Sequence, residues 1–175
     1  MGERIFEQDT LCLVGIEPTY AAGAALTAAA NAMRVKVDFN PMDGEQEAMS
    51  YDAGRGGSQG SIRRSKFVSG NLDNCYLSGS GTAGTPPPYS ALLEMAGLKP
   101  TVVAATSVTY APVFPVDKSG VVQFYRGRVK HEVKGARCGF ELSLGTNALP
   151  KLKFTNLMGL YVEPVHVASF QNANF

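Results

Sequence analysis

The strongest constraint on the fold is a two-residue alternation of apolar and polar side chains in the second half of the sequence. It is clearest over residues 137–144, where the apolar side chains share one parity: Cys138, Phe140, Leu142 and Leu144. Successive side chains of a β-strand point to opposite faces, so this stretch is predicted to be a half-buried strand. Two more strands are predicted at Val121–Tyr125 and Val129–Lys134, joined by a tight turn that uses the positive φ available to Gly127. We therefore expect an antiparallel meander in this half.

Two further stretches show the same period. Over residues 34–39 the apolar members, predicted to face the core, are Val35, Val37 and Phe39. The polar members, predicted to face away, are Arg34, Lys36 and Asp38. Over residues 151–163 one parity carries the apolar side chains, with an interruption at Asn156: Leu152, Phe154, Met158, Leu160 and Val162. The 19 glycines and 10 prolines supply the frequent turns that short strands need, so a mainly β fold is predicted.

One amphipathic helix is predicted over residues 86–97. A proline suits the first turn of a helix, and Thr85 is available as its N-cap. Gly97 and then Pro100 end it. Its apolar side chains fall at i, i+3, i+4 and i+7 and are expected to seal the core: Tyr89, Leu92, Leu93 and Ala96. The alanine-rich stretch 21–33 offers little to bury, so residues 1–33 are interpreted as an N-terminal arm and connection with at most a short helix.

Residues 40–64 form a long stretch without clear periodicity between two predicted strands. Its first part is acidic, its middle is the glycine-rich run Gly54–Gly60, and its end is basic. A loop of this length inside a domain needs either a function or disorder to account for it. We interpret it as a hairpin that contacts a partner, with a solvated flexible loop as the alternative. Residues 165–175 are expected to form a C-terminal tail.

Length and composition fit a single globular domain spanning residues 1–175. The chain is 45% hydrophobic and 18% charged, which is too apolar for a disordered chain. Its 16 basic and 15 acidic residues leave a net charge of +1, so the general attraction of a basic protein to nucleic acid or anionic lipid is missing. No run is long and apolar enough to span a bilayer, and the first ten residues lack the apolar region of a signal peptide. We expect no membrane partner.

The sequence offers little for catalysis or metal binding. Cys12, Cys75 and Cys138 stand far apart and are interpreted as buried thiols made in a reducing compartment, and two histidines do not complete a zinc ligand set. Gly79–Gly84 matches GxGxxG, but Thr85–Pro88 separates it from the helix and removes three N–H donors that a pyrophosphate would need. Neither histidine lies in a motif that ties it to a nucleophile. No enzyme activity, no cofactor and no metal are therefore predicted.

A series of short motifs runs through the chain. Those in the middle are Ser78–Pro86, then Leu92-Leu93 with Ala96-Gly97, then Val108–Tyr110 with Pro112. Those upstream and downstream are Glu17–Tyr20, Ala30–Ala32, Gly135–Arg137, Pro150, Leu152, Phe154, and Gly159–Tyr161 followed by Pro164. Together, over nearly the whole chain, they resemble the major tail tube proteins of long-tailed, siphovirus-like bacteriophages. The run Phe154–Gly159 is one residue longer than the usual Phe-x-Phe-x-Gly of that family, which would fit a β-bulge at Asn156 or Leu157.

The resemblance implies the phage tail tube fold: an antiparallel β-sandwich or half-barrel with one flanking helix and a long inter-strand loop. Six copies would form a ring, and rings would stack into the tube that conducts DNA into the host. The partners would be the protein itself, the tail terminator, and the tail-tip and tape-measure proteins, with DNA passing transiently and without specificity. The location would be the virion tail, and the host cytoplasm during assembly.

Two surfaces are expected to serve this assembly. The long loop would contact a neighbouring ring through opposed charges and polar groups, with contacts expected at Asp43, Glu45, Arg55, Ser58, Arg63 and Arg64. The polar side of the strand over 34–39 would face the lumen, through Arg34, Lys36 and Asp38. Mixed signs there would keep the wall wet while limiting attraction to the phosphate backbone.

Three other classes of protein stay open. A tube subunit of a contractile tail, of a phage-like bacteriocin or of type VI secretion would share the fold. A tail terminator or a head decoration protein would stop at one ring instead of polymerising. A small-ligand-binding β-barrel would hold a dry apolar cavity inside one subunit.

Overall fold

The chain is built almost entirely of antiparallel β-strands. The computed structural model describes residues 10–49 and 60–167, with 54% of residues in strands and 7% in helices. The strands are β1 (Thr10–Ile16), β2 (Ala32–Met33), β3 (Lys36–Asp43), β4 (Gln46–Ala48), β5 (Ser61–Arg63), β6 (Phe67–Tyr76), β7 (Leu98–Val103), β8 (Ser107–Pro112), β9 (Gly120–Arg126), β10 (Val129–Ser143), β11 (Lys151–Tyr161) and β12 (Val165–His166). The helices are α1 (Ala28–Asn31) and α2 (Ser90–Met95), and no helix in the described ranges is long and apolar enough to cross a membrane.

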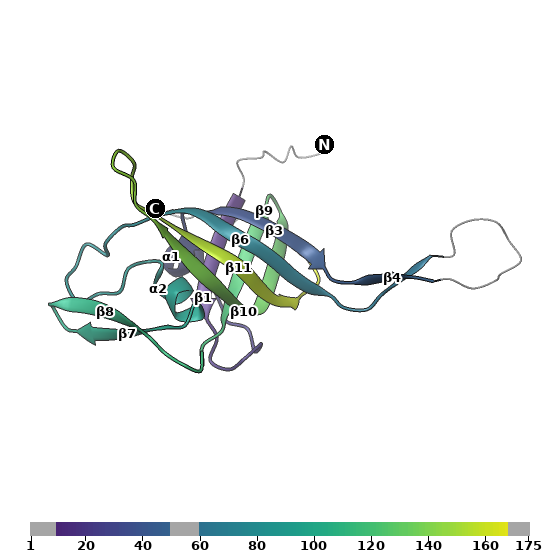
Figure 1. The fold of residues 1–175 in the computed structure, drawn as a ribbon, viewed down its shortest axis with the longest axis horizontal. Helices are drawn as coiled ribbons and strands as arrows, with labels where there is room; N and C mark the ends of the chain where they lie inside the picture. The colour runs from purple at the N-terminus through teal and green to yellow at the C-terminus, as the bar shows by residue number, and fades with distance from the viewer. Residues whose placement is uncertain (1–9, 50–59, 168–175) are drawn as a thin grey trace, which may run out of the picture.

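One large sheet holds most of these strands. Its order is β2-β1-β9-β10-β11-β6-β3, with β12 pairing to β10, and every pair is antiparallel. The neighbours β9, β10 and β11 are consecutive in the chain, so the second half forms the expected meander (Figure 1). Gly127 has a φ of +58° in the turn between β9 and β10. Two smaller ribbons, β4–β5 and β7–β8, stand apart from the large sheet.

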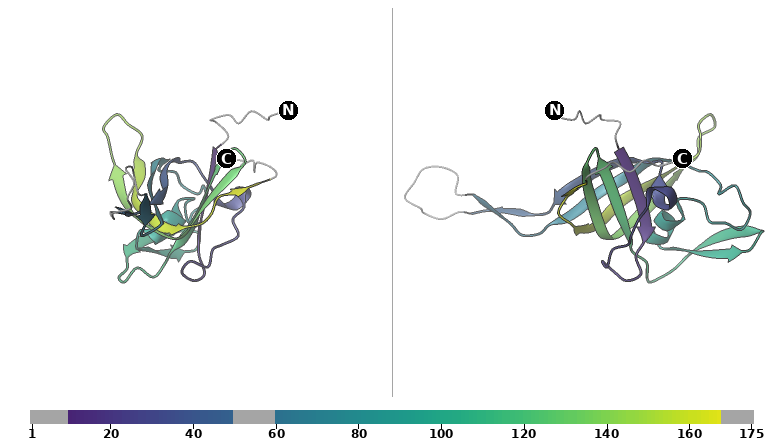
Figure 2. Two further views of the ribbon diagram at one scale, coloured as in Figure 1. Left: turned by 90° about the vertical axis from the view of Figure 1, so that its right-hand side faces the viewer. Right: turned by 180° about the vertical axis from the view of Figure 1, so that it is seen from behind.

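The large sheet is strongly curved. The ring of Phe39 on β3 lies 6.5 Å from the ring of Phe124 on β9, although these strands are not neighbours in the sheet. The sheet therefore bends its β3 edge back toward β9, and Figure 2 shows the sheet end on and from behind. The register of β10 against β9 shifts between Val133 and Ala136, and such an irregularity increases the local bend of a strand.

The inner, concave face of the sheet surrounds the main core. Side chains from β1, β6, β9, β10 and β11 meet α2 in one cluster, whose fully buried members include Leu72, Leu92, Phe154 and Leu157. A smaller cluster lies on the other face of β1 and β9, where α1 and its flanking residues cover Leu11, Leu13 and Tyr125. The helix α2 and the connection through α1 thus cover opposite faces of the same sheet.

The helix is shorter than the sequence predicts. The prediction of a helix over 86–97 capped by Thr85 is wrong: α2 spans six residues, and its N-cap is Tyr89. Each of the three prolines lacks an N–H group, and a residue before proline avoids the helical region, so Pro86–Pro88 stay outside the helix. The C-terminal end is where it was expected, because Gly97 takes a φ of +87°. Leu92, Leu93 and the unpredicted Met95 are buried, whereas Tyr89 and Ala96 are half-buried.

A bulge in β11 changes which side chains reach the core. Asn156 has a φ of +52°, and the register of β11 against β6 shifts between Phe154 and Leu157. The irregularity lies where a β-bulge was expected. The sequence prediction did not, however, include its effect on the side chains that follow it. Leu157 is buried, and Met158 and Leu160 are exposed, so the prediction that they share the core parity of Phe154 is wrong. One extra residue reverses the parity of all that follows.

A buried carboxylate fixes the connection between β1 and α1. Glu17 is 4% exposed, and its carboxylate accepts hydrogen bonds from the backbone N–H groups of Ala21 (3.0 Å), Gly23 (3.2 Å) and Gly135 (3.0 Å). The hydroxyl of Ser119 donates a fourth at 2.8 Å. These donors offset the cost of removing the charge from water. The loop after β1 is thereby tied to β10.

Candidate assembly interface

A two-stranded arm projects from one end of the molecule. The strands β4 and β5 continue β3 and β6 away from the large sheet, with Glu47 paired to Ile62 (Figure 1). Residues 40–64 are therefore not one long loop, because β3 runs on to Asp43 and the stem of the arm is a ribbon. Almost every residue of β4 and β5 is exposed on both faces, so no apolar alternation marks them in the sequence.

The base of the arm is held by charged residues that were predicted to meet a neighbour. Asp43 accepts a hydrogen bond from the Ser69 hydroxyl at 2.5 Å and one from the Gly44 N–H at 2.9 Å. The Ser69 bond, followed by the Gly44 bond, holds the pKa of the Asp43 carboxyl below its ordinary value. The guanidinium of Arg63 donates to the carbonyl of Met42 at 2.6 Å. Asp43 and Arg63 thus make contacts within their own subunit.

The other described residues of the arm that were predicted to contact a neighbouring ring are more exposed to solvent than Asp43 and Arg63. The backbone of Glu45 accepts a bond from the Arg64 N–H at 2.9 Å, and the Glu45 side chain is exposed. The Arg64 guanidinium lies 3.5 Å from the Glu47 carboxylate, with both side chains largely in solvent. Arg55 and Ser58 lie outside the described residues.

The predicted lumen residues lie on or beside the edge strand β3. Lys36 and Asp38 are exposed. Val37 and Phe39, which alternate with them, are half-buried against the core, as the sequence predicts. Asp38 stands opposite Asn71 and Lys36 opposite Asp73 in the β3–β6 ladder. Arg34 precedes β3 and is also exposed. The convex face is therefore polar and of mixed charge here, and its exposure to a lumen stays a prediction.

The opposite end of the molecule carries an apolar groove. It has a volume of about 660 Å³ and lies between the end of the β10–β11 pair, α2, the β7–β8 ribbon and the loop after β6. Its apolar lining includes Leu77, Leu93, Val108, Phe140 and Leu142. None of the described residues that line it carries a charge.

Phe140 and Leu142 are the clearest departure from the sequence prediction. Their parity is correct, because they stand opposite the buried Phe154 and Leu152 in the β10–β11 ladder. Yet they are 41% and 51% exposed, so the strand predicted to be half-buried is open at its end. The six-residue helix α2 is too short to cover this part of the concave face.

Three hydroxyls around the groove donate hydrogen bonds within the subunit. The Tyr110 hydroxyl donates to Ser90 at 2.7 Å, and the Ser80 hydroxyl donates to the carbonyl of Thr85 at 2.9 Å. The Thr106 hydroxyl donates to the carbonyl of Ala104 at 3.2 Å. The groove wall therefore presents mainly ring and methyl surface. The β7–β8 ribbon that supplies Val108 and Tyr110 was not predicted, although the alternation over Ser107–Pro112 is visible in the sequence.

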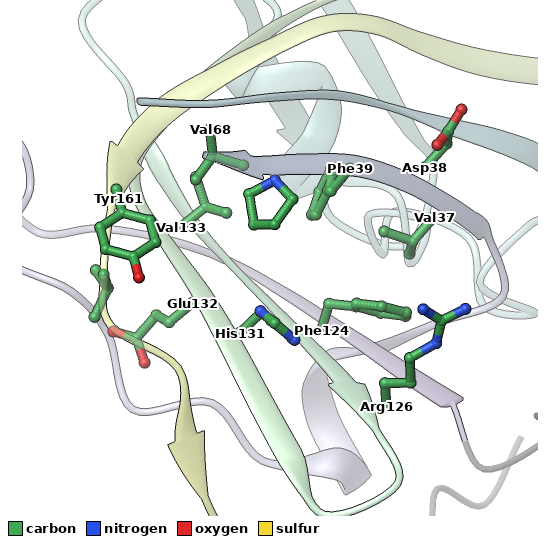
Figure 3. A pocket seen from close by; sticks show the side chains of 12 residues that line it. Val37, Asp38, Phe39, Val68, Phe124, Arg126, His131, Glu132, Val133 and Tyr161 are labelled. Carbon is green, nitrogen blue, oxygen red and sulfur yellow. The ribbon is translucent and has the colours of Figure 1, made fainter. Parts of the chain in front are cut away.

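A second, smaller pocket lies inside the curve of the sheet near the arm. It has a volume of about 230 Å³, and Phe124, His131 and Arg126 lie along one wall, facing Val37 and Phe39 (Figure 3). The His131 and Phe124 rings are 6.4 Å apart. Burial, followed by the charge of Arg126, lowers the pKa of His131. Within the described ranges, the side chains of His131 and Arg126 make no hydrogen bond, while their backbones pair in the β9–β10 ladder.

The described residues hold no cluster of three or more His, Cys, Asp or Glu side chains that would suit a metal ion. Cys12 and Cys75 are buried and Cys138 is half-buried; all three are free thiols. Burial raises the pKa of Cys12 and of Cys138 to about 12, and that of Cys75 to about 11. Burial therefore disfavours the thiolate form of all three at neutral pH.

No protein-family model matches this chain, and no curated protein sequence matches it.

Proposed function

We propose that this protein is a structural subunit that assembles into hexameric rings, and that the rings stack into the tail tube of a long-tailed phage. The observation that carries the proposal is the arm, a ribbon whose β4 and β5 strands make no pairing with the large sheet of their own subunit. An isolated two-stranded ribbon is marginally stable in water, so such an arm is expected to rest on a partner. The motif resemblance implies that this partner is a further copy of the chain.

The rest of the fold suits this role. A curved antiparallel sheet flanked by the short helices α1 and α2 supports the half-barrel that the motif resemblance implies. The edge strand β3 carries eight residues and pairs only with β6 among the described strands. An unpaired edge is an aggregation hazard unless another chain covers it, and closure into a ring would do so. Contacts that rotate and rise from copy to copy generate a filament.

The protein would then reside in the virion tail after assembly in the host cytoplasm. It would meet the tail terminator and the tail-tip and tape-measure proteins at the two ends of the tube. The polar side of β3, with Lys36 and Asp38, would line the lumen beside passing DNA. A tube subunit of a contractile tail, bacteriocin or type VI system, a terminator and a head decoration protein are the related alternatives.

Negative-stain electron microscopy of the purified protein tests the proposal. Long tubes of uniform diameter are expected at high concentration, whereas single closed rings would identify a terminator-like or decoration protein. Deleting Gly54–Gly60 should leave a folded subunit that no longer forms long tubes, because the arm loses its end. Normal tubes from this deletion variant would exclude the arm as the stacking element.

A second candidate function, binding of a small ligand, is favoured by the pocket of about 230 Å³ beside β3. Its lining combines the rings of Phe39 and Phe124 with the side-chain donors of Arg126 and His131, which would bind a compact aromatic carboxylate, although Asp38 and Glu132 in the same lining would oppose its charge. Titration with benzoate, followed by the NMR resonances of His131, distinguishes the two functions. Saturable shifts that vanish in Arg126→Gln but persist in Arg64→Gln would support a ligand-binding protein.

A further inference from the structure

We infer that the apolar groove, lined by Leu77, Leu93, Val108, Phe140 and Leu142, is a docking surface for a second copy of this chain. The inference rests on the proposed function, because it names the surface through which copies of an assembling subunit meet. It concerns the end of the molecule opposite the arm (Figure 1).

The first argument is the exposed apolar area at this end. Leu77, Phe140 and Leu142 line the groove, Leu144 continues the parity of β10, and Val102 stands opposite Val108 in the β7–β8 ladder. These five residues are between 37% and 71% exposed, so together they expose on the order of 400–500 Å². That is at the size where an exposed patch on a monomer marks an interaction site. It also equals roughly the apolar share of one partner's ~800 Å² in an interface of standard size.

The second argument is the chemistry of the lining. A site for a small ligand needs a few polar groups that orient the ligand. Here the hydroxyls of Ser80, Thr106 and Tyr110 donate to acceptors within the subunit, and the other polar side chains of the lining are the neutral hydroxyls of Ser78, Thr85, Tyr89 and Ser107. The described lining residues also lack a charge that would attract nucleic acid or an acidic peptide. The groove lining is therefore mainly apolar and uncharged, which suits contact with another apolar protein surface.

The third argument is the incomplete cover of the sheet. Phe140 and Leu142 belong to the same face as the buried Phe154 and Leu152, so the core layer continues past the end of α2. A second copy seated here would extend that layer across the subunit boundary. Burial of both side chains would then stabilise the assembly and not the isolated subunit.

The test compares two lysine substitutions that differ only in which face they alter. Leu142 and Met158 are each 51% exposed, but Leu142 faces the groove and Met158 lies on the convex face, next to the buried Leu157. We expect Leu142→Lys to raise the concentration needed for self-association at least about tenfold, because a charge would enter an apolar contact. Met158→Lys should associate like the unaltered protein. Analytical ultracentrifugation measures the association, and thermal unfolding checks that each subunit is folded.

Five outcomes decide the inference. Self-association of Leu142→Lys at the unaltered concentration would overturn it, as would equal losses in both variants or a natural chain that stays monomeric. Tubes that form regardless of Leu142→Lys would keep the proposed function and reject the groove. If the natural chain forms only closed dimers and Leu142→Lys dissociates them, the groove is a docking surface but the proposed tube function is wrong.

A cysteine variant covers the case in which the lysine prevents folding. Leu142→Cys introduces one exposed thiol beside three native thiols whose pKa values are about 11 to 12. Maleimide labelling at that thiol should slow at least about tenfold on assembly, because the contact excludes the reagent. Met158→Cys, exposed to the same extent, should label at one rate in both states. Unchanged labelling of Leu142→Cys would overturn the inference.

Discussion

The arm and the groove lie at opposite ends of one molecule and differ in how they are built. At the arm, charged side chains such as Arg64 and Glu47 stand in solvent and form an exposed ion pair, while Asp43 and Arg63 hold the base. At the groove, apolar side chains such as Phe140 continue a buried layer that its own subunit does not finish. Exposed ion pairs contribute little free energy, whereas apolar burial contributes in proportion to area. In the proposed assembly, the arm end would therefore be suited to setting the register between copies, and the groove end to supplying their affinity.

The largest expected change in the free energy of unfolding is at Leu93, a buried residue of the groove. Leu93 lines the groove but is 7% exposed and packs in the main core. Leu93→Ala should lower the free energy of unfolding by about 2–5 kcal/mol, the range for a leucine truncated in a packed core. Chemical denaturation of the unassembled subunit measures it.

Leu142→Ala is the matched control, because Leu142 lines the same groove at 51% exposure. It should cost less than about 1 kcal/mol in the isolated subunit. A loss below about 1 kcal/mol in Leu93→Ala would instead mean that α2 is not part of the core.

A middle-sized effect is expected from the hydroxyl of Tyr110 in the groove wall. Tyr110→Phe removes the 2.7 Å hydrogen bond to Ser90 while keeping the ring in place. The free energy of unfolding should fall by about 1 kcal/mol, the net value of one hydrogen bond. Self-association should stay as in the unaltered protein, because the ring surface remains. Weaker association at equal stability would mean that the hydroxyl itself reaches the partner.

The sequence predicted the elements whose side chains alternate against a core. The meander of β9 to β11 and the inward parity of Val37 and Phe39 follow from the two-residue period, which burial on one face enforces. The turn at Gly127 and the helix end at Gly97 follow from positive φ, which glycine adopts without strain.

What the sequence did not predict depends on contacts distant along the chain. Nothing local distinguishes Phe140, left open, from Phe154, fully buried, because the difference lies in how far α2 extends over the sheet. The role of Glu17 likewise depends on Gly135 and Ser119, more than a hundred residues away. The ribbon β4–β5 has no buried face, so it carries no period to read.

A pH-dependent effect is expected at the base of the arm. The pKa of Asp43 is lowered in the folded protein, chiefly by the Ser69 hydroxyl, so its ionised form stabilises the fold. That contribution is fully present above the unfolded pKa of about 3.9 and is lost as the pH falls through the lower folded value. Asp43→Asn should therefore be less stable than the natural chain above about pH 5, and the difference should shrink below about pH 4. A difference that stays constant down to pH 2 would show that the carboxylate charge is not what Ser69 and Gly44 stabilise.

The smallest expected effect is that of the ion pair on the arm itself. The Arg64 guanidinium and Glu47 carboxylate are 3.5 Å apart, but their side chains are 63% and 67% exposed. Water screens such a pair, so a double-mutant cycle with Arg64→Gln and Glu47→Gln should give a coupling energy between about 0 and 1 kcal/mol, falling in 1 M salt. The same two substitutions should change the concentration needed for association far less than Leu142→Lys, because in the proposed assembly the arm would align copies and the groove would supply the affinity. Coupling well above about 1 kcal/mol that persists in high salt would reverse the comparison, because only a pair shielded from water behaves in that way.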